Sequence, residues 1–193
     1  MEQRSPRLDV ARAAVLVLLA GLFYALSSGA HAYSVDEITN YASARALVES
    51  GSPDLSGEQP FPREQLLTLR HPSMDRSTGR YGLLSWVGMS PAELLARWTN
   101  SQPPPPSSTF PQPSAVRPVA ALLYGPTIAA LLVGATFLLG RNLGLRPRYA
   151  AAAATVLAFA SPLWVYAQGL ANIPLAALFG VLAFVAVTGS RSG

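Results

Sequence analysis

The sequence contains no cysteine, and all 14 of its basic residues are arginine, because lysine is also absent. The lack of cysteine excludes disulfides, thiolate metal sites and cysteine nucleophiles. Charge is scarce as well: only 12% of the residues are charged, about half the density of an ordinary soluble domain, whereas 50% are hydrophobic. Arginine and alanine in this excess are typical of a GC-rich bacterial genome. The composition therefore predicts a bacterial membrane protein.

Three long uncharged runs predict the membrane spans. Two of them, 13–32 and 119–140, have about the 20 residues that cross a bilayer, but the third extends from Tyr149 to Ser190, about twice that length. A glycine, polar side chains and a proline at 168–174 predict a turn within it. We therefore expect an all-α integral membrane protein with four transmembrane helices, at 13–32, 119–140, 149–167 and 174–190.

Small residues and one proline predict details of these spans. Ala130 and Gly134 lie four residues apart, and alanines fill 150–154, so both stretches suit close packing between helices. Proline removes a helical hydrogen bond, so Ser161-Pro162 predicts a kink in the third span.

The arginines of the short segments predict the orientation. They precede the first span, lie between the second and third, and follow the fourth: Arg4, Arg7, Arg12, Arg141, Arg146, Arg148 and Arg191. The positive-inside rule places segment 1–12, loop 141–148 and the C-terminus in the cytoplasm, which predicts a multi-pass protein of the bacterial inner membrane. Segment 33–117 is then an extracytoplasmic loop. As an alternative, Ala30-His31-Ala32 matches a signal-peptide cleavage site, so removal of residues 1–32 stays open.

The outer loop contains two predicted helices and a proline-rich strap. Ser34 is the expected N-cap of a helix at 35–50 that Gly51 ends, and Ser90 with Pro91 predicts a second helix at 90–99. We expect both helices to lie against the membrane surface, with an irregular stretch between them. The prolines of 102–118 predict an extended strap that leads to the second span.

Asp36 and Glu37 are the candidate catalytic residues, since they are the first acids after the first span. Carboxylates here either complete the helix cap or act on a lipid-borne substrate as a general base or a ligand for a divalent metal ion. The other candidates are weaker: lone histidines without metal-ligand spacing, and arginines that either bind phosphate or balance nearby acids. These are His31, His71, Arg63, Arg70, Arg76 and Arg80. The sequence has no basic stripe interleaved with aromatic residues, so we do not expect nucleic-acid binding.

The Asp-Glu pair in YSVDEITNYASARALVESGSPDLS, the stretch GRYGLLSW and the turn LLGRNLGLRPRY resemble the amino-terminal part of the GT-C membrane glycosyltransferases. This family includes the protein mannosyltransferases and the aminoarabinose transferases. The resemblance implies transfer of a sugar from a polyprenyl-phosphate donor to an extracytoplasmic acceptor. It also implies that Asp36 is the catalytic acid or base, with Glu37 beside it.

Two differences from the pattern of this family determine which function we expect. Asn172 stands where many members have a second carboxylate, and an amide cannot take up a proton at neutral pH. The four predicted spans are also fewer than the family core contains. We therefore expect a non-catalytic GT-C-like subunit, without a cofactor, that packs with lipid and with other integral membrane subunits. The alternative is that the chain is the N-terminal part of a glycosyltransferase that binds a polyprenyl-phosphate lipid.

Overall fold

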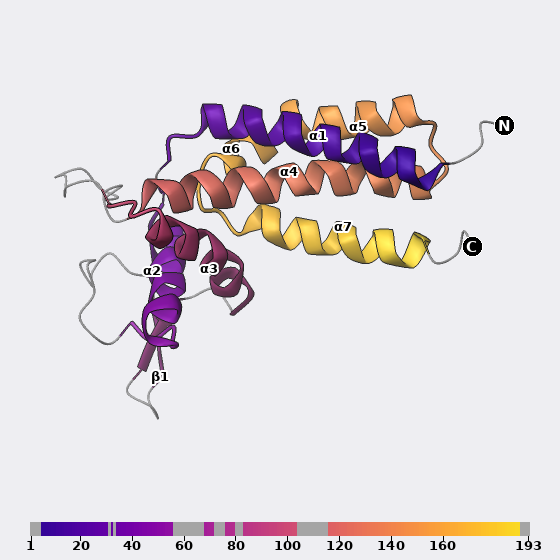
Figure 1. Ribbon diagram of the computed structural model, residues 1–193. Helices are drawn as coiled ribbons and strands as arrows, with labels where there is room; N and C mark the ends of the chain where they lie inside the picture. The colour runs from indigo at the N-terminus through magenta and orange to yellow at the C-terminus, as the bar shows by residue number, and fades with distance from the viewer. Residues whose placement is uncertain are drawn as a thin grey trace. The chain divides into compact units, whose positions relative to one another are not determined.

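The computed structural model describes residues 5–30, 32, 34–55, 68–71, 76–79, 83–103 and 116–189 (Figure 1). Helices account for nearly all of the regular structure in these ranges, together with one two-stranded hairpin. The chain divides into two compact units. Unit 1 comprises residues 1–27, 126–167 and 173–193, and unit 2 comprises residues 28–125 and 168–172.

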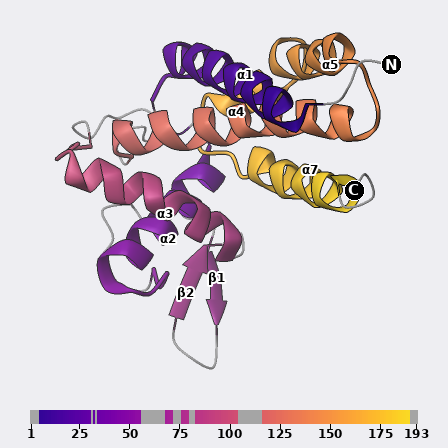
Figure 2. The ribbon, with the colours of Figure 1, turned by 45° about the vertical axis from the view of Figure 1, so that its right-hand side comes forward.

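Unit 1 is a bundle of helices that run alongside one another (Figures 1 and 2). Its elements are α1 (Pro6–Ser27), α5 (Pro147–Phe159), α6 (Leu163–Ala167), α7 (Ile173–Gly189) and the larger part of α4 (Pro118–Asn142). Two of the described helices, α1 and α4, are long and apolar enough to cross a membrane, and α7 is a shorter apolar helix.

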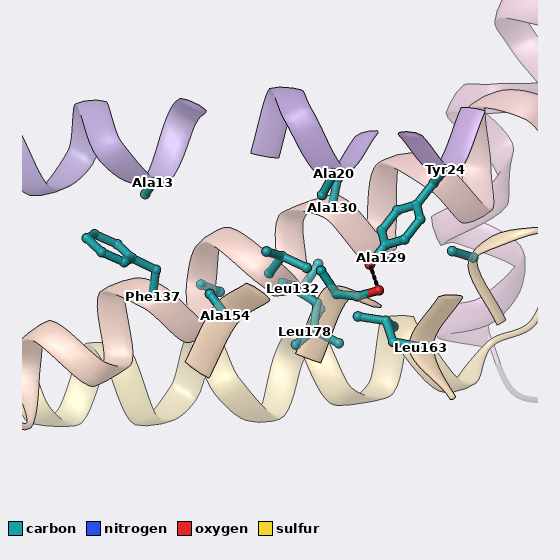
Figure 3. Packing of buried hydrophobic residues seen from close by; sticks show 14 of the residues in the cluster. Ala13, Ala20, Tyr24, Ala129, Ala130, Leu132, Phe137, Ala154, Leu163 and Leu178 are labelled. Carbon is teal, nitrogen blue, oxygen red and sulfur yellow. Dashed lines mark hydrogen bonds between the residues drawn. The ribbon is translucent and has the colours of Figure 1, made fainter. Parts of the chain in front are cut away.

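Alanines and large apolar side chains such as Tyr24 and Phe137 together fill the interior of unit 1 (Figure 3). A side-chain carbon added at Gly134 of α4 would collide with Val17 of α1, so this glycine lets the two helices approach closely. Ala150, Ala154 and Ala158 form a completely buried stripe at four-residue intervals along α5. Both predicted small-residue surfaces are therefore confirmed as packing surfaces.

Most helix ends in unit 1 lie close to the predicted span limits. The expected kink is a break: α5 ends at Phe159, and α6 begins at Leu163, directly after Pro162. The expected turn occupies 168–172, between α6 and α7. The first span is shifted, because α1 begins at Pro6, where proline suits the first helical turn, and ends at Ser27 instead of continuing to residue 32. Ala30 has a φ of 53°, which is incompatible with a continuing helix.

Unit 2 contains α2 (Val35–Ser50), α3 (Leu83–Trp98) and an antiparallel hairpin of β1 (Thr68–His71) and β2 (Arg76–Gly79) (Figure 2). Helix α2 packs against α3 and lies beside β2. The hairpin was not predicted, because 68–79 lacks the alternation of apolar and polar residues that usually marks strands. The fold class is therefore helical with one small hairpin added.

The predicted start of the second outer helix was wrong. Helix α3 begins at Leu83, so Pro91 lies inside the helix instead of at its first turn. Ser90 does not cap a helix: its hydroxyl donates a hydrogen bond of 2.8 Å to the carbonyl of Trp86, one turn earlier. A helix accommodates such a proline when packing on other residues offsets the missing hydrogen bond. Most of the proline-rich strap at 102–118, namely 104–115, lies outside the described residues.

Candidate functional site

Asp36 and Glu37 lie in the first turn of α2, at the position that the sequence predicts. Ser34 has an extended backbone, and its hydroxyl accepts a hydrogen bond of 3.3 Å from the amide of Glu37. At the other end Gly51 adopts a left-handed φ of 72°, and its amide donates to the carbonyl of Leu47 at 2.9 Å. Both predicted signals for this helix, the N-cap and the glycine stop, are therefore confirmed.

The two carboxylates differ in accessibility. Asp36 is half-buried, whereas Glu37 is only 9% exposed. A carboxylate in the first turn interacts favourably with the helix dipole, and this placement agrees with a capping role for both. Asn172 lies in the turn between α6 and α7. Within the described residues, no group of three or more His, Asp or Glu side chains is arranged to hold a metal ion.

Three of the weaker candidates lie on the hairpin. Arg70 and His71 lie on β1, and Arg76 lies on β2, where the backbone register pairs it with His71. His31, Arg63 and Arg80 lie outside the described residues.

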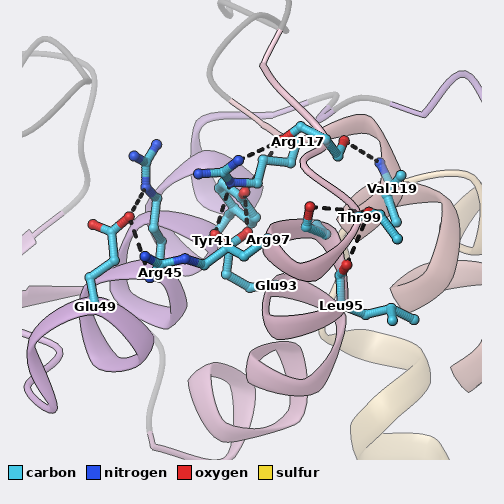
Figure 4. A network of polar contacts seen from close by, with 11 residues as sticks. Tyr41, Arg45, Glu49, Glu93, Leu95, Arg97, Thr99, Arg117 and Val119 are labelled. Carbon is cyan, nitrogen blue, oxygen red and sulfur yellow. Dashed lines mark hydrogen bonds and ion pairs between the residues drawn. The ribbon is translucent and has the colours of Figure 1, made fainter.

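A buried polar network that the sequence did not predict joins the two helices of unit 2 (Figure 4). Glu93 of α3 is 0% exposed. Its Oε2 accepts a hydrogen bond of 2.5 Å from the Tyr41 hydroxyl, and its Oε1 accepts one of 3.0 Å from Nε of Arg117. The Arg117 backbone amide donates in turn to the Tyr41 hydroxyl at 3.2 Å. Residues from α2, from α3 and from the segment before α4 are thereby held together.

The arginine also connects this network to the chain that leaves α3. Nη1 of Arg117 donates to the carbonyl of Ser101 at 2.5 Å, and the Ser101 hydroxyl accepts from the amide of Val119 at 3.4 Å (Figure 4). Burial, followed by the hydrogen bond to Glu93 and by its charge, raises the pKa of Tyr41 above its ordinary value. Tyr41 therefore stays a neutral hydrogen-bond donor at physiological pH.

The geometry of this network indicates a structural role. Both oxygens of Glu93 are occupied, and the side chain is inaccessible to a substrate, so the carboxylate is placed to hold Arg117 and Tyr41. Local sequence signals do not reveal it, since the spacing of Ser90, Pro91 and Glu93 indicates a capping box. The partners lie 24 and 52 residues from Glu93, beyond the reach of any helical periodicity.

A second ion pair lies in unit 1, near the end of the bundle where α1 begins and α4 ends. Asp9 is buried, and its Oδ2 accepts a hydrogen bond of 2.9 Å from Nε of Arg141. Arg12, one turn further along α1, is 3.6 Å from the other carboxylate oxygen. Arg141 also donates to the carbonyl of Leu145, which fixes the turn before α5. The sequence predicts a role of these arginines in topology but does not predict this ion pair.

Comparison with known proteins gives no further guide to this arrangement. A scan against protein-family models, a search of curated proteins and a search of solved structures each found no match. The resemblance to the GT-C glycosyltransferases thus stays a prediction from the residues quoted above.

Proposed function

We propose that this chain is a non-catalytic integral membrane subunit, GT-C-like in its arrangement, that packs in and stabilises a larger membrane complex. In this proposal unit 1 provides four spans of the bacterial inner membrane, with both termini in the cytoplasm, and unit 2 is extracytoplasmic. Its partners are the bilayer and other integral membrane subunits.

The observation that carries the proposal is the large exposed apolar surface of unit 1. Several leucines of α1 point outward: Leu18 is 72% exposed and Leu26 is 80% exposed, whereas its buried apolar positions are Ala13, Ala20 and Tyr24. Large exposed apolar residues continue along α7, for example Phe184. Water penalises an apolar surface this extensive, whereas lipid chains or neighbouring membrane helices cover it without cost.

The charges of unit 1 support the proposed orientation. The described arginines of this unit fall at the start of α1, at the end of α4 and around the turn into α5: Arg7, Arg12, Arg141, Arg146 and Arg148. These segments lie at one end of the bundle (Figure 1). An arginine-rich end is typical of the cytoplasmic side.

Helix α3 supports contact of unit 2 with the membrane surface. It buries Trp86, Met89 and Ala96 but exposes an apolar face along its whole length, and Trp98 at its end is 81% exposed. The members of this face are Leu83, Leu84, Val87, Leu94, Leu95 and Trp98. A helix with one apolar face and a terminal tryptophan is typical of the membrane–water interface.

Cysteine labelling tests the topology, because the chain has no cysteine of its own. We expect Gln102→Cys, in the exposed segment after α3, to react with an impermeant maleimide in intact spheroplasts. Leu143→Cys, in the exposed turn after α4, should react only after lysis. The opposite pattern would overturn the orientation. Release of the chain from membranes by alkaline carbonate would overturn membrane insertion itself.

Isolation in mild detergent tests the subunit assignment. A chain of 20.3 kDa that migrates as part of a complex of fixed composition after native electrophoresis supports it. The assignment would be contradicted if the chain is inserted in the membrane before extraction but is a monodisperse monomer in the same detergent.

The alternative proposal is that this chain is the N-terminal part of a glycosyltransferase that uses a polyprenyl-phosphate sugar. The observation in its favour is that half-buried Asp36 follows the end of α1 by nine residues, so that the carboxylate emerges soon after a candidate span. Asp36→Asn separates the two proposals. We expect the variant to assemble normally with no change in membrane sugar transfer. A loss of transfer with intact assembly would favour the enzyme.

A further inference from the structure

A groove of about 660 Å³ lies within unit 1, between α1, the later part of α4 and the start of α5. Its volume is within the range of about 300–1,000 Å³ that small-molecule sites occupy. The walls are almost entirely apolar, with Leu8 and Val15 of α1 and Phe137 of α4 among them. The remaining described chain leaves this groove unfilled, so an apolar occupant fits it.

Two arginines give the groove a charged rim. Arg12 of α1 and Arg148 of α5 both line it. The Arg12 side chain is 39% exposed and shares Asp9 with Arg141, which makes the shorter contact of the two with that carboxylate. Among the described residues, Asp9 is the acid near the rim and is engaged by two arginines, so the rim guanidiniums keep a net positive charge.

Arg148 is held in place by an aromatic ring. Its guanidinium carbon is 4.7 Å from the centroid of the Tyr149 ring, and Nη2 donates to the Tyr149 hydroxyl at 2.9 Å. In the described part of the chain it forms no ion pair with a carboxylate. Its charge is thus available to an anion at the rim, and arginine binds phosphate oxygens with two parallel hydrogen bonds.

We propose that this groove binds one anionic phospholipid, with an acyl chain along the apolar walls and the headgroup phosphate between Arg12 and Arg148. The inference rests on the proposed insertion of unit 1 into the membrane, where such a lipid is the surrounding solvent. Basic pockets between membrane helices on the cytoplasmic side are suited to anionic headgroups. A zwitterionic lipid has the same chains but lacks the net charge that the rim complements.

Lipid titration of the full chain tests this site. The delipidated protein in nonionic detergent is titrated with phosphatidylglycerol or with phosphatidylcholine of identical chains, and bound lipid is counted by native mass spectrometry. We expect tighter binding of phosphatidylglycerol. The double variant Arg12→Gln/Arg148→Gln should weaken that binding roughly 25-fold. Each arginine near an anionic lipid contributes about 1 kcal/mol of binding free energy, and two of them correspond to this change in affinity. Its phosphatidylcholine binding should not change.

A matched control removes the same charge from the same end of the bundle. Arg7→Gln/Arg146→Gln alters two exposed arginines that do not line the groove, and it should retain phosphatidylglycerol binding. Ala151→Phe should block the groove to both lipids, whereas Ala152→Phe, on the exposed side of α5, should not.

Three results would overturn the site: equal affinity for the two lipids, equal weakening by both double variants, or full binding by Ala151→Phe. Vesicle flotation in alkaline carbonate separates this failure from that of the proposed function. A chain that stays inserted but shows no lipid preference contradicts the groove alone. A chain that carbonate extracts contradicts the proposed function and the site together.

Discussion

The interiors of the two units are built from different side chains. The interior of unit 1 is almost entirely apolar and combines many alanines with a few large side chains such as Tyr24 and Phe137, while many of its leucines are exposed. Unit 2 buries polar groups as well as apolar ones: Thr39, Asn40 and Ser43 of α2 are almost completely inaccessible, and Glu93 of α3 is wholly so. Among the described residues, Asp9 is the one buried polar or charged residue of unit 1, whereas unit 2 buries several.

Under the proposed function, this difference has a physical reason, because lipid surrounds unit 1 and water surrounds unit 2. Apolar side chains gain nothing by leaving lipid, so helices there associate through close van der Waals contact between small residues. In water the burial of apolar groups drives folding, and a buried charge is tolerated only when it is paired and hydrogen-bonded. We therefore expect that the loss of a buried polar side chain destabilises unit 2 and that an added large side chain destabilises unit 1. Amide hydrogen exchange read by mass spectrometry follows both units separately in one sample.

The largest expected effect is the loss of Glu93. Glu93→Ala leaves the Arg117 side chain, which is only 12% exposed, without its carboxylate and removes the acceptor of the Tyr41 hydroxyl. Removing one partner of a buried ion pair costs about 3–5 kcal/mol. We expect the protection of amide hydrogens in α2 and α3 to fall by the factor that corresponds to this loss of free energy, while protection in α1 and α5 is unchanged.

Glu49→Ala is the matched control for this variant. Glu49 accepts a hydrogen bond of 2.9 Å from Nε of Arg45 within α2 and lies 3.8 Å from Nη1 of Arg97 of α3, but its side chain is 38% exposed. Exposed pairs contribute about 0–1 kcal/mol, so the effect should be small. An equal loss of protection in both variants would show that the buried network has no special role.

Sequence reasoning predicted the elements that depend on neighbouring residues. The cap at Ser34, the stop at Gly51, the break at Pro162 and the turn at 168–172 each result from a few adjacent side chains. The helical class follows from the same local patterns. In the site, the position of Asp36 and Glu37 in a first helical turn was predictable for this reason.

The features that were missed depend on residues far apart in the chain. Glu93 meets Arg117 and Tyr41 only after α2 and α3 have packed, so its local sequence context indicated a cap instead. The early start of α3 has the same origin, since burial of Trp86 and Met89 against the rest of unit 2 stabilises the turns before Pro91. The groove rim likewise joins residues from α1 and α5.

Added bulk in unit 1 gives the next largest effect. Gly134→Leu places a side chain against Val17 and the carbonyl of Ala13, so α1 and α4 must separate. Overpacking of this kind costs about 1–3 kcal/mol. We expect faster exchange in α1 and in the later turns of α4, with α2 and α3 unaffected.

Gly180→Leu adds the same side chain at an open position of α7, where no atom lies within 4 Å of the added carbon. It should leave exchange unchanged, or slow it slightly, because leucine is a better helix former than glycine. Equal destabilisation by the two leucines would contradict the close packing of α1 on α4.

High pH should weaken unit 2 through Tyr41. Its pKa in the folded state lies above the ordinary value of 10.0, mainly because the side chain is buried and secondly because it donates to Glu93. Below pH 10 the hydroxyl is protonated whether the chain is folded or unfolded, so its contribution is fully present. As the pH rises further, only the unfolded state loses the proton, and the free energy of unfolding falls.

The variant Tyr41→Phe isolates this titration. It should be less stable than the parent at pH 8, because Glu93 and the Arg117 amide each lose a partner, but its stability should fall less steeply between pH 10 and pH 11. Parallel slopes for Tyr41→Phe and the parent would contradict the raised pKa.

The smallest effect is expected at the N-cap of α2. Ser34→Ala removes the oxygen that accepts from the Glu37 amide, and loss of such a cap costs about 1 kcal/mol. Ser34→Thr keeps an oxygen at this position and should restore most of the loss. Because the cap acts on one helix, faster exchange should begin in the first turn of α2 and leave unit 1 unchanged. An equal response in α1 would mean that the two units unfold as one, and their different interiors would then share a single cooperative transition.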